Sequence, residues 1–303
     1  MIVDCYTHTW ESPSQPGTCG TDDATHRAIP HDLSDPLAAG AGRHLAAAEP
    51  VDTTIVVGFT SCYLGADIAN DRIAEYVAGH PDRLIGFAGI DPSDPAGAIA
   101  ELHRVREALH MPGIAVAPAA QDFHPTSSHA MRVYAEAAGA GMPILFHTGV
   151  RMGAPTKLEY ARPVLLDEIA RELPDLKIVV AHMGYPWTDE TILLLAKHRH
   201  VYAEISWLLP QPWQAYLAIL AAHQHGVTDK LLFGSGFPYA RAANCIEELY
   251  GINHFASGTN LPTIPRDALR GIVERDALGL LGIHRPREQN TLQPITTIPN
   301  ENA

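Results

Sequence analysis

The chain of 303 residues has little cysteine, and the little it has is scattered. Its four cysteines are Cys5, Cys19, Cys62 and Cys245, and no two of them form a C-x-x-C pair. Four thiols spread over a chain of this length exclude a disulfide framework. The sequence therefore predicts reduced thiols.

Positive charge and long apolar runs are also scarce. The chain has 21 Lys and Arg against 34 Asp and Glu, a formal net charge of −13, which repels a phosphate backbone and excludes nucleic acid as an expected partner. No window reaches the roughly 18 uninterrupted apolar residues of a membrane span. The opening segment MIVDCYTHTW has no basic region followed by a long apolar stretch. We therefore expect a cytoplasmic protein with no membrane partner.

What the sequence does have is a regular alternation of short apolar runs and longer segments with helical periodicity. The apolar runs are rich in β-branched residues and cover residues 2–5, 53–58, 84–88, 113–117, 143–147, 177–181, 201–205 and 230–234. The helical segments cover residues 37–48, 67–78, 94–109, 127–140, 158–172, 187–198, 211–225 and 242–250. Eight strands in strict alternation with eight helices predict an α/β fold whose parallel sheet closes into a (β/α)8 TIM barrel.

An open, doubly wound sheet is the alternative fold. That fold normally has a glycine-rich phosphate loop after its first strand, and the sequence there is DCYTHTWESP. We therefore predict one barrel domain over residues 1–285. Residues 11–35 form a long insertion after the first strand, which in a barrel lies over the pocket as a lid or contacts a partner subunit. Residues 286–303 are expected to be a disordered tail.

Polar residues that could carry chemistry stand at the ends of several predicted strands. His8 follows the first strand, His147 ends the fifth, His182 follows the sixth and Glu204 lies at the end of the seventh. A single histidine of this kind would more often be a hydrogen-bonded core or rim residue. Three at three strand ends predict a shared polar site, because the carboxyl ends of barrel strands converge on one pocket.

Four stretches of the sequence make a family recognisable. They are GMPILFHTG, the run ARPVLLDEIARELPDLKIVVAHMGYPW, LLFGSGFPY and VERDALGLLGI. On these motifs the chain resembles, from about residue 2 to residue 283, the amidohydrolase-related family that includes aminocarboxymuconate-semialdehyde decarboxylase. The resemblance implies a TIM barrel that acts as a hydrolase or lyase, decarboxylase-like or hydratase-like, on a small organic acid or amide.

The resemblance also implies roles for particular residues. In that family an H-x-H pair after strand one, a histidine after strand five and an aspartate after strand eight hold a metal, and a histidine after strand six acts as acid/base or orients substrate. His8 and His147 match two of the metal ligands, and His182 matches the acid/base. Two positions depart from the pattern: Tyr6 stands at the first histidine of the pair, and Gly236 stands at the aspartate of the usual GSDFP stretch.

These departures weaken the implied metal site. A catalytic zinc needs about three protein ligands, and His8 and His147 supply two. Tyr6 binds metal less readily than imidazole because its unperturbed pKa is near 10, and Gly236 has no side chain. The expected cofactor is therefore one divalent metal, zinc before iron or manganese, that is weakly bound or absent. Glu204 could replace the lost aspartate in catalysis or ligation, or it could be a paired residue at the rim.

The predicted substrate contacts combine aromatic walls with groups beside the strand ends. Trp10, Trp187 and Trp207 could wall the pocket, or could be ordinary packing residues. Arg151 could hold a substrate carboxylate through its bidentate fork, or could be a solvated loop residue. The full predicted set is Tyr6, Trp10, Arg151, Trp187, Trp207 and Gly236.

Two classes of function remain open. The first is the family enzyme, with His182 as general acid or base. The second is a non-catalytic accessory subunit that pairs with a metal-binding paralogue, and it is motivated by the replacements at Tyr6 and Gly236. The expected partners are a small-molecule substrate and either a second copy or an amidohydrolase paralogue, giving a homodimer or a hetero-oligomer.

Overall fold

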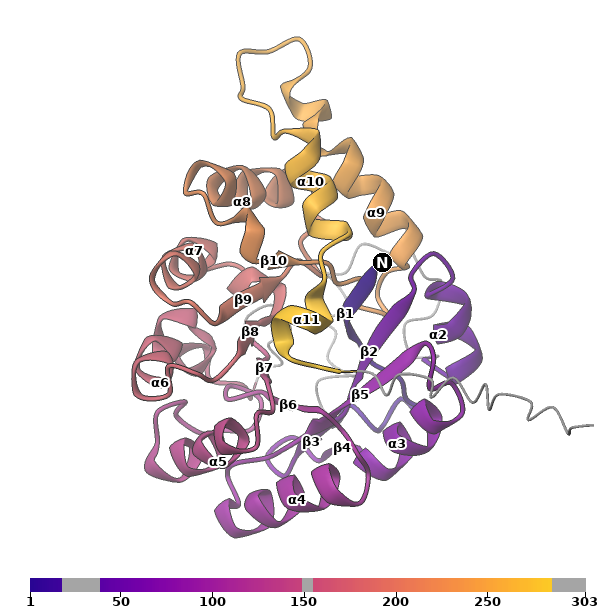
Figure 1. Ribbon diagram of the computed structural model, residues 1–303, viewed down its shortest axis with the longest axis vertical. Helices are drawn as coiled ribbons and strands as arrows, with labels where there is room; N and C mark the ends of the chain where they lie inside the picture. The colour runs from indigo at the N-terminus through magenta and orange to yellow at the C-terminus, as the bar shows by residue number, and fades with distance from the viewer. Residues whose placement is uncertain (18–38, 149–154, 285–303) are drawn as a thin grey trace, which may run out of the picture.

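The computed structural model describes residues 1–17, 39–148 and 155–284, and in them the predicted TIM barrel is confirmed (Figure 1). Eight parallel strands form one sheet in the order β1-β2-β5-β6-β7-β8-β9-β10. They are β1 (Val3–Thr7), β2 (Thr53–Val57), β5 (Leu84–Gly89), β6 (Gly113–Val116), β7 (Ile144–Phe146), β8 (Ile178–Val180), β9 (Val201–Glu204) and β10 (Leu231–Leu232). The two edges of this sheet meet, because Cys5 N–H donates to Phe233 O at 2.9 Å and Gly236 N–H to Tyr6 O at 3.0 Å.

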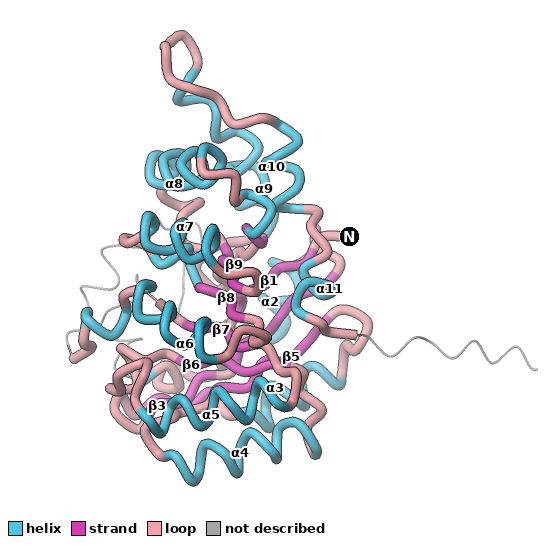
Figure 2. The backbone as a smooth tube through the Cα atoms, turned by 60° about the vertical axis from the view of Figure 1, so that its left-hand side comes forward, coloured by secondary structure: helices cyan, strands magenta, loops and turns pink. Residues whose placement is uncertain are grey.

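Helices surround the strands in both views of the chain (Figures 1 and 2). They are α2 (Ala41–Ala47), α3 (Asn70–Ala78), α4 (Pro95–Glu107), α5 (Ser128–Gly139), α6 (Leu166–Glu172), α7 (Thr188–Lys197), α8 (Pro212–Gln224), α9 (Ala242–Gly251), α10 (Arg266–Val273) and α11 (Ala277–Leu281). The start of α4 shows how local sequence fixes these bounds. Asp94 caps it by accepting from Gly97 N–H at 3.2 Å, and Pro95 stands at its first position, where no hydrogen bond is lost.

The apolar core has two parts. The larger lies between the sheet and the outer helices, where Tyr134 of α5 meets Phe146 of β7 edge to face at 5.2 Å between ring centroids. The smaller fills the inside of the barrel, and Leu278 and Leu281 of α11 join it, so that α11 closes one end. A functional site is therefore expected at the opposite end of the barrel, where the strands end.

The structure differs from the prediction in two segments. A short antiparallel hairpin, β3 (Phe59–Ser61) and β4 (Ala66–Ile68), was not predicted, and it pairs Phe59 with Ile68. The helix predicted from residue 67 therefore begins only at Asn70. In the segment 158–172, two 3-10 turns, Leu158–Ala161 and Pro163–Leu165, precede the shorter α6.

Several predictions fall outside the described residues. The insertion at residues 11–35 is described only as far as Gly17, while Arg151 and the tail at residues 286–303 are not described. Within the part of the chain that the structure does describe, no helix is both long enough and apolar enough to cross a membrane. The cytoplasmic location and the oligomer stay predictions.

Candidate active site

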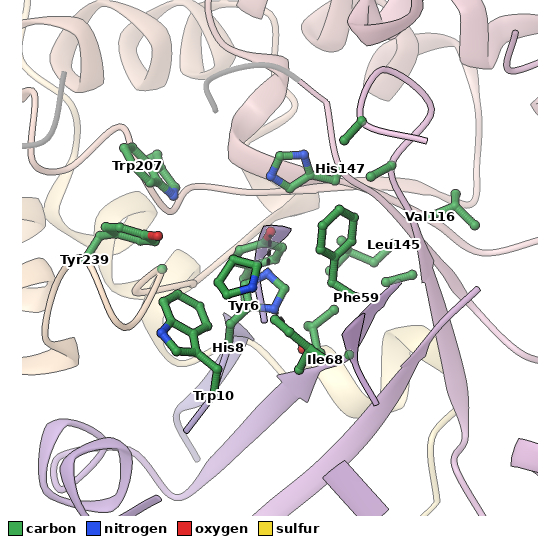
Figure 3. A pocket seen from close by; sticks show the side chains of 17 residues that line it. Tyr6, His8, Trp10, Phe59, Ile68, Val116, Leu145, His147, Trp207 and Tyr239 are labelled. Carbon is green, nitrogen blue, oxygen red and sulfur yellow. Dashed lines mark hydrogen bonds between the residues drawn. The ribbon is translucent and has the colours of Figure 1, made fainter. Parts of the chain in front are cut away.

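A pocket opens where the barrel strands end, as the strand-end histidines predicted (Figure 3). Its empty space, counted out to the open mouth, is about 690 Å³. The residues that line it come from the ends of the strands and from the loops that follow: Tyr6, His8, Trp10, Pro16, Val57, Gly58, Phe59, Ile68, Ala115, Val116, Ala117, Ala120, Leu145, His147, Trp207, Gly236 and Tyr239. Most of this lining is apolar, so the pocket suits an uncharged or aromatic surface.

Tyr6 and His8 form the polar centre of the pocket and are joined by a hydrogen bond (Figure 3). The Tyr6 hydroxyl lies 2.8 Å from His8 Nε2, and His8 Nδ1 lies 2.8 Å from the carbonyl oxygen of Val57. A carbonyl only accepts, so the network assigns the proton of Nδ1 to this bond. In the neutral imidazole Nε2 is then an acceptor, and Tyr6 donates to it.

The histidine after β8 lies beneath this centre. His182 is fully buried, and its ring meets those of Tyr6 and His147 edge to face at centroid distances of 4.7 and 5.0 Å. Its Nδ1 lies 2.7 Å from Ser206 Oγ, while its Nε2 is buried with no hydrogen-bond partner among the described residues. The structure places His8, His147 and His182 around the ring of Tyr6, although His182 is not among the described lining residues. Its acid/base role stays a prediction.

Glu204 supports the floor of the site and does not face the pocket. It is fully buried at the end of β9 and accepts the backbone N–H of His182 at 2.6 Å and that of Ser206 at 2.7 Å. Its Oε1 also lies 3.2 Å from His182 Nδ1. His182 and Met183 both have positive φ, at 56° and 48°, a conformation that costs energy for residues with a side chain. Glu204 therefore holds a strained turn in place, and a direct catalytic role for it stays a prediction.

A second carboxyl group, Asp4, lies under the same floor. It accepts from Ser235 N–H at 2.9 Å and from Tyr6 N–H at 3.3 Å, which fixes the backbone on both sides of the barrel closure. Burial raises the pKa of Asp4 to about 7, although the hydrogen bonds from Ser235 and Tyr6 lower it. Its Oδ2 is buried without a hydrogen-bond partner among the described residues, as suits a neutral carboxyl.

Aromatic side chains wall the pocket on both sides of Tyr6 and His8 (Figure 3). Trp10 and Trp207 lie on one side, and both approach Tyr239, at centroid distances of 6.3 and 4.9 Å. Tyr239 was not predicted as a pocket residue from the sequence. It directly follows Gly236, Phe237 and Pro238 in the segment after β10, so its position near a strand end was the signal that could have identified it. Trp187 lies at the start of α7, outside the described lining.

The described residues do not fit the metal site that the resemblance implies. Gly236 has φ +75°, and a Cβ built there would lie 3.2 Å from Ser206 Cβ and 3.4 Å from Trp207 Cδ1, so a side chain at this position would be strained and crowded. His8 Nε2 is engaged by the Tyr6 hydroxyl. Residues 1–17, 39–148 and 155–284 hold no group of three or more His, Cys, Asp or Glu side chains placed to bind a metal ion. We therefore derive no step through a metal.

Fold and pocket define a TIM-barrel protein with a pocket at the carboxyl ends of its strands. The chain belongs to the amidohydrolase family, whose pattern matches residues 3–283. A search of curated proteins finds no sequence match.

Solved structures share the fold at low identity. An uncharacterized TIM-barrel protein from Bordetella bronchiseptica is 22% identical with a TM-score of 0.72, over 93% of this chain and 98% of that one. A dihydroxybenzoic acid decarboxylase from a Polaromonas species, solved with manganese and the inhibitor 2-nitroresorcinol, is 17% identical with a TM-score of 0.67, over 94% and 98% of the two chains. A probable 2-pyrone-4,6-dicarboxylic acid hydrolase from Acinetobacter baumannii, with citric acid bound, is 14% identical with a TM-score of 0.64, over 93% and 99%.

Proposed function

We propose that this protein is a lyase of the amidohydrolase family that decarboxylates a small aromatic acid in the pocket around Tyr6 and His8. The observation that carries the proposal is the composition of the pocket: aromatic and aliphatic walls around a proton-bearing pair at its centre. The accessory subunit is the alternative that failure of the proposal would favour.

The apolar lining supports decarboxylation because it disfavours the charged form of the substrate. Val116 and Leu145 form one side of the pocket, opposite the tryptophans (Figure 3), and Ala115 also lines it. A carboxylate held against such a surface loses hydration, whereas the CO2 that it releases is uncharged. The walls also offer flat faces on which an aromatic ring can stack.

The placement of the carboxylates argues against hydrolysis. Hydrolysis needs a base that takes a proton from the attacking water. Gly236 removes the side chain at the position where the resemblance led us to expect an aspartate, and Glu204 is fully buried and bonded to two backbone N–H groups. Among the described lining residues there is no Asp or Glu. Decarboxylation needs a proton donor instead, and the pocket offers one.

The test is conversion of a set of dihydroxybenzoates by the purified full chain, with the phenol product and CO2 both quantified. We expect at least one member to be converted, and we expect Trp207→Ala to lower kcat/KM about tenfold or more because one wall is lost. Trp213→Ala on α8 is the matched control: Trp213 is 44% exposed and outside the described lining, so its loss should leave kcat/KM unchanged.

Two results would overturn the proposal. One is failure to convert any member of the set together with failure to bind 2-nitroresorcinol, a nitro analogue of 2,6-dihydroxybenzoate. The other is release of a hydrolysis product without CO2. Inactivity combined with a co-purifying amidohydrolase paralogue would support the accessory subunit.

A further inference from the structure

The Tyr6 hydroxyl stands where the family resemblance led us to expect a metal-binding imidazole. Tyr6 is 3% exposed and lines the pocket. Its backbone is held on both sides, because its N–H donates to Asp4 Oδ1 at 3.3 Å and its carbonyl accepts from Gly236 N–H at 3.0 Å. Its ring packs edge to face on His182, at 4.7 Å between centroids. The hydroxyl is therefore held at a fixed place on the pocket floor.

His8 joins this hydroxyl to the backbone of the neighbouring strand. Its Nε2 lies 2.8 Å from the Tyr6 oxygen, and its Nδ1 lies 2.8 Å from the carbonyl oxygen of Val57, at the end of β2. The bond to Val57 keeps a proton on Nδ1 whether or not Nε2 carries one. Only Nε2 can therefore gain or lose a proton, and it faces Tyr6. The geometry is that of a two-residue proton relay.

We propose that Tyr6 is the catalytic acid of this site and that His8 resupplies its proton, so that the pair does the work without the metal ion of the family. This inference rests on the proposed decarboxylation. His8 is here a positioning and relay residue, because the substrate carbon takes its proton from Tyr6. A proton donor at the position of an expected metal ligand explains why the described residues do not fit a metal ion.

The proposed step starts from the phenol of Tyr6 and His8 protonated on both ring nitrogens. The Tyr6 O–H proton moves to the ring carbon that bears the carboxylate, while the Tyr6 oxygen takes the proton of His8 Nε2. The bond between that carbon and the carboxylate then breaks, its electron pair stays with the aromatic ring, and CO2 leaves. One proton from solvent returns His8 to its starting state, so each turnover consumes one carboxylate and one proton and yields the arene and CO2.

The buried Nε2 of His182 fits the same arrangement. It has no hydrogen-bond partner among the described residues, and its ring lies between those of Tyr6 and His147. A buried polar atom left unpaired is costly, and functional sites are where such atoms are retained.

The first test compares Tyr6→Phe with Tyr134→Phe, the same loss of a hydroxyl at two places. The Tyr134 hydroxyl is buried in the helix layer with no hydrogen-bond partner among the described residues, so its loss should leave turnover unchanged. Tyr6→Phe keeps the ring and removes only the hydroxyl group. With the dihydroxybenzoate that the wild type converts, we expect kcat to fall about 100- to 10,000-fold and KM to stay within about threefold, as for loss of a general acid.

A second measurement reads the relay without turnover. In protein labelled with ¹⁵N-histidine, the His8 Nε2 resonance reports the protonation of Nε2 and its hydrogen bond to a hydroxyl, and His8→Gln identifies the signal. We expect Tyr6→Phe to move this resonance and Tyr134→Phe to leave it in place. Binding of 2-nitroresorcinol confirms that each variant is folded. If Tyr6→Phe does not fold, His8→Gln replaces it, with the same expected loss of kcat.

The possible outcomes distinguish failure of the Tyr6–His8 relay from failure of the proposed decarboxylation. An active wild type with a Tyr6→Phe variant of near wild-type kcat overturns the relay and leaves decarboxylation standing. An unmoved His8 resonance overturns the relay as well. A wild type that decarboxylates nothing removes both. A large fall in kcat together with a moved resonance supports both.

Discussion

Glu204→Gln is the substitution that most directly probes the buried support of the site. The wild-type carboxylate accepts two backbone N–H groups, those of His182 and Ser206, at 2.6 and 2.7 Å, and it is fully buried. Glutamine has the same shape, but only its carbonyl oxygen can accept. Its NH2 group must face one of the two N–H donors, which leaves two donors opposed and one hydrogen bond lost.

The expected cost follows from the kind of bond that is lost. A hydrogen bond to a charged group contributes about 1.5–3 kcal/mol, and an unpaired buried donor adds about 1–3 kcal/mol, less what relaxation recovers. We therefore expect Glu204→Gln to lower the free energy of unfolding by about 2–4 kcal/mol. At roughly 2 °C per kcal/mol for a larger domain, Tm falls by about 4–8 °C.

The assay is thermal unfolding of matched samples by calorimetry. Glu136→Gln is the control. The Glu136 side chain is 49% exposed, and its one ion-pair contact among the described residues is a long one, 3.7 Å to the half-exposed His103, so this substitution should move Tm by less than about 1 °C. An equally small change for Glu204→Gln would refute the claim that this carboxylate holds the strained turn at His182.

Two further substitutions test the same floor. Gly234→Ala should lower stability by about 1–3 kcal/mol, because a Cβ there would lie 2.3 Å from the Oε2 atom of Glu204, whereas Gly139→Ala, with no atom within 4 Å of its Cβ, should not; urea unfolding of both variants checks this. Asp4 has a folded pKa of about 7, above its unfolded value of 3.8, so it contributes stability that is lost as pH rises from about 4 to 7. The free energy of unfolding of Asp4→Asn relative to that of the wild type should therefore rise by about 1.4 kcal/mol per pH unit in that window. Parallel curves of stability against pH for the two proteins would contradict the raised pKa.

The barrel could be predicted because its signals are local and repeated. The eight β-branched runs became the eight strands, because a strand buried on both faces needs a continuous apolar run. The β3–β4 hairpin could not be read in this way. Its residues, FTSCYLGADI, mix polar and apolar side chains, and its pairing depends on its place above the end of β2.

The site could be predicted only as far as the positions of its residues. The predicted strand ends gave the positions of Tyr6, His8, His147 and His182 in the sequence. In the structure these residues form four ring pairs with centroid distances of 4.7 to 6.1 Å. Which way each side chain points is set by backbone turns that sequence spacing does not encode. The positive φ at His182 places that ring under the floor, and the alternation along β9 turns Glu204 toward backbone N–H groups.

The proton transfer proposed for this pocket needs no metal ion, although the family resemblance implies one. The direct measurement is the elemental content of protein purified without metal-affinity resin, combined with dihydroxybenzoate turnover before and after EDTA. We expect well under about one metal ion per chain and turnover that EDTA does not change. About one equivalent of zinc, iron or manganese that EDTA removes together with turnover would contradict it.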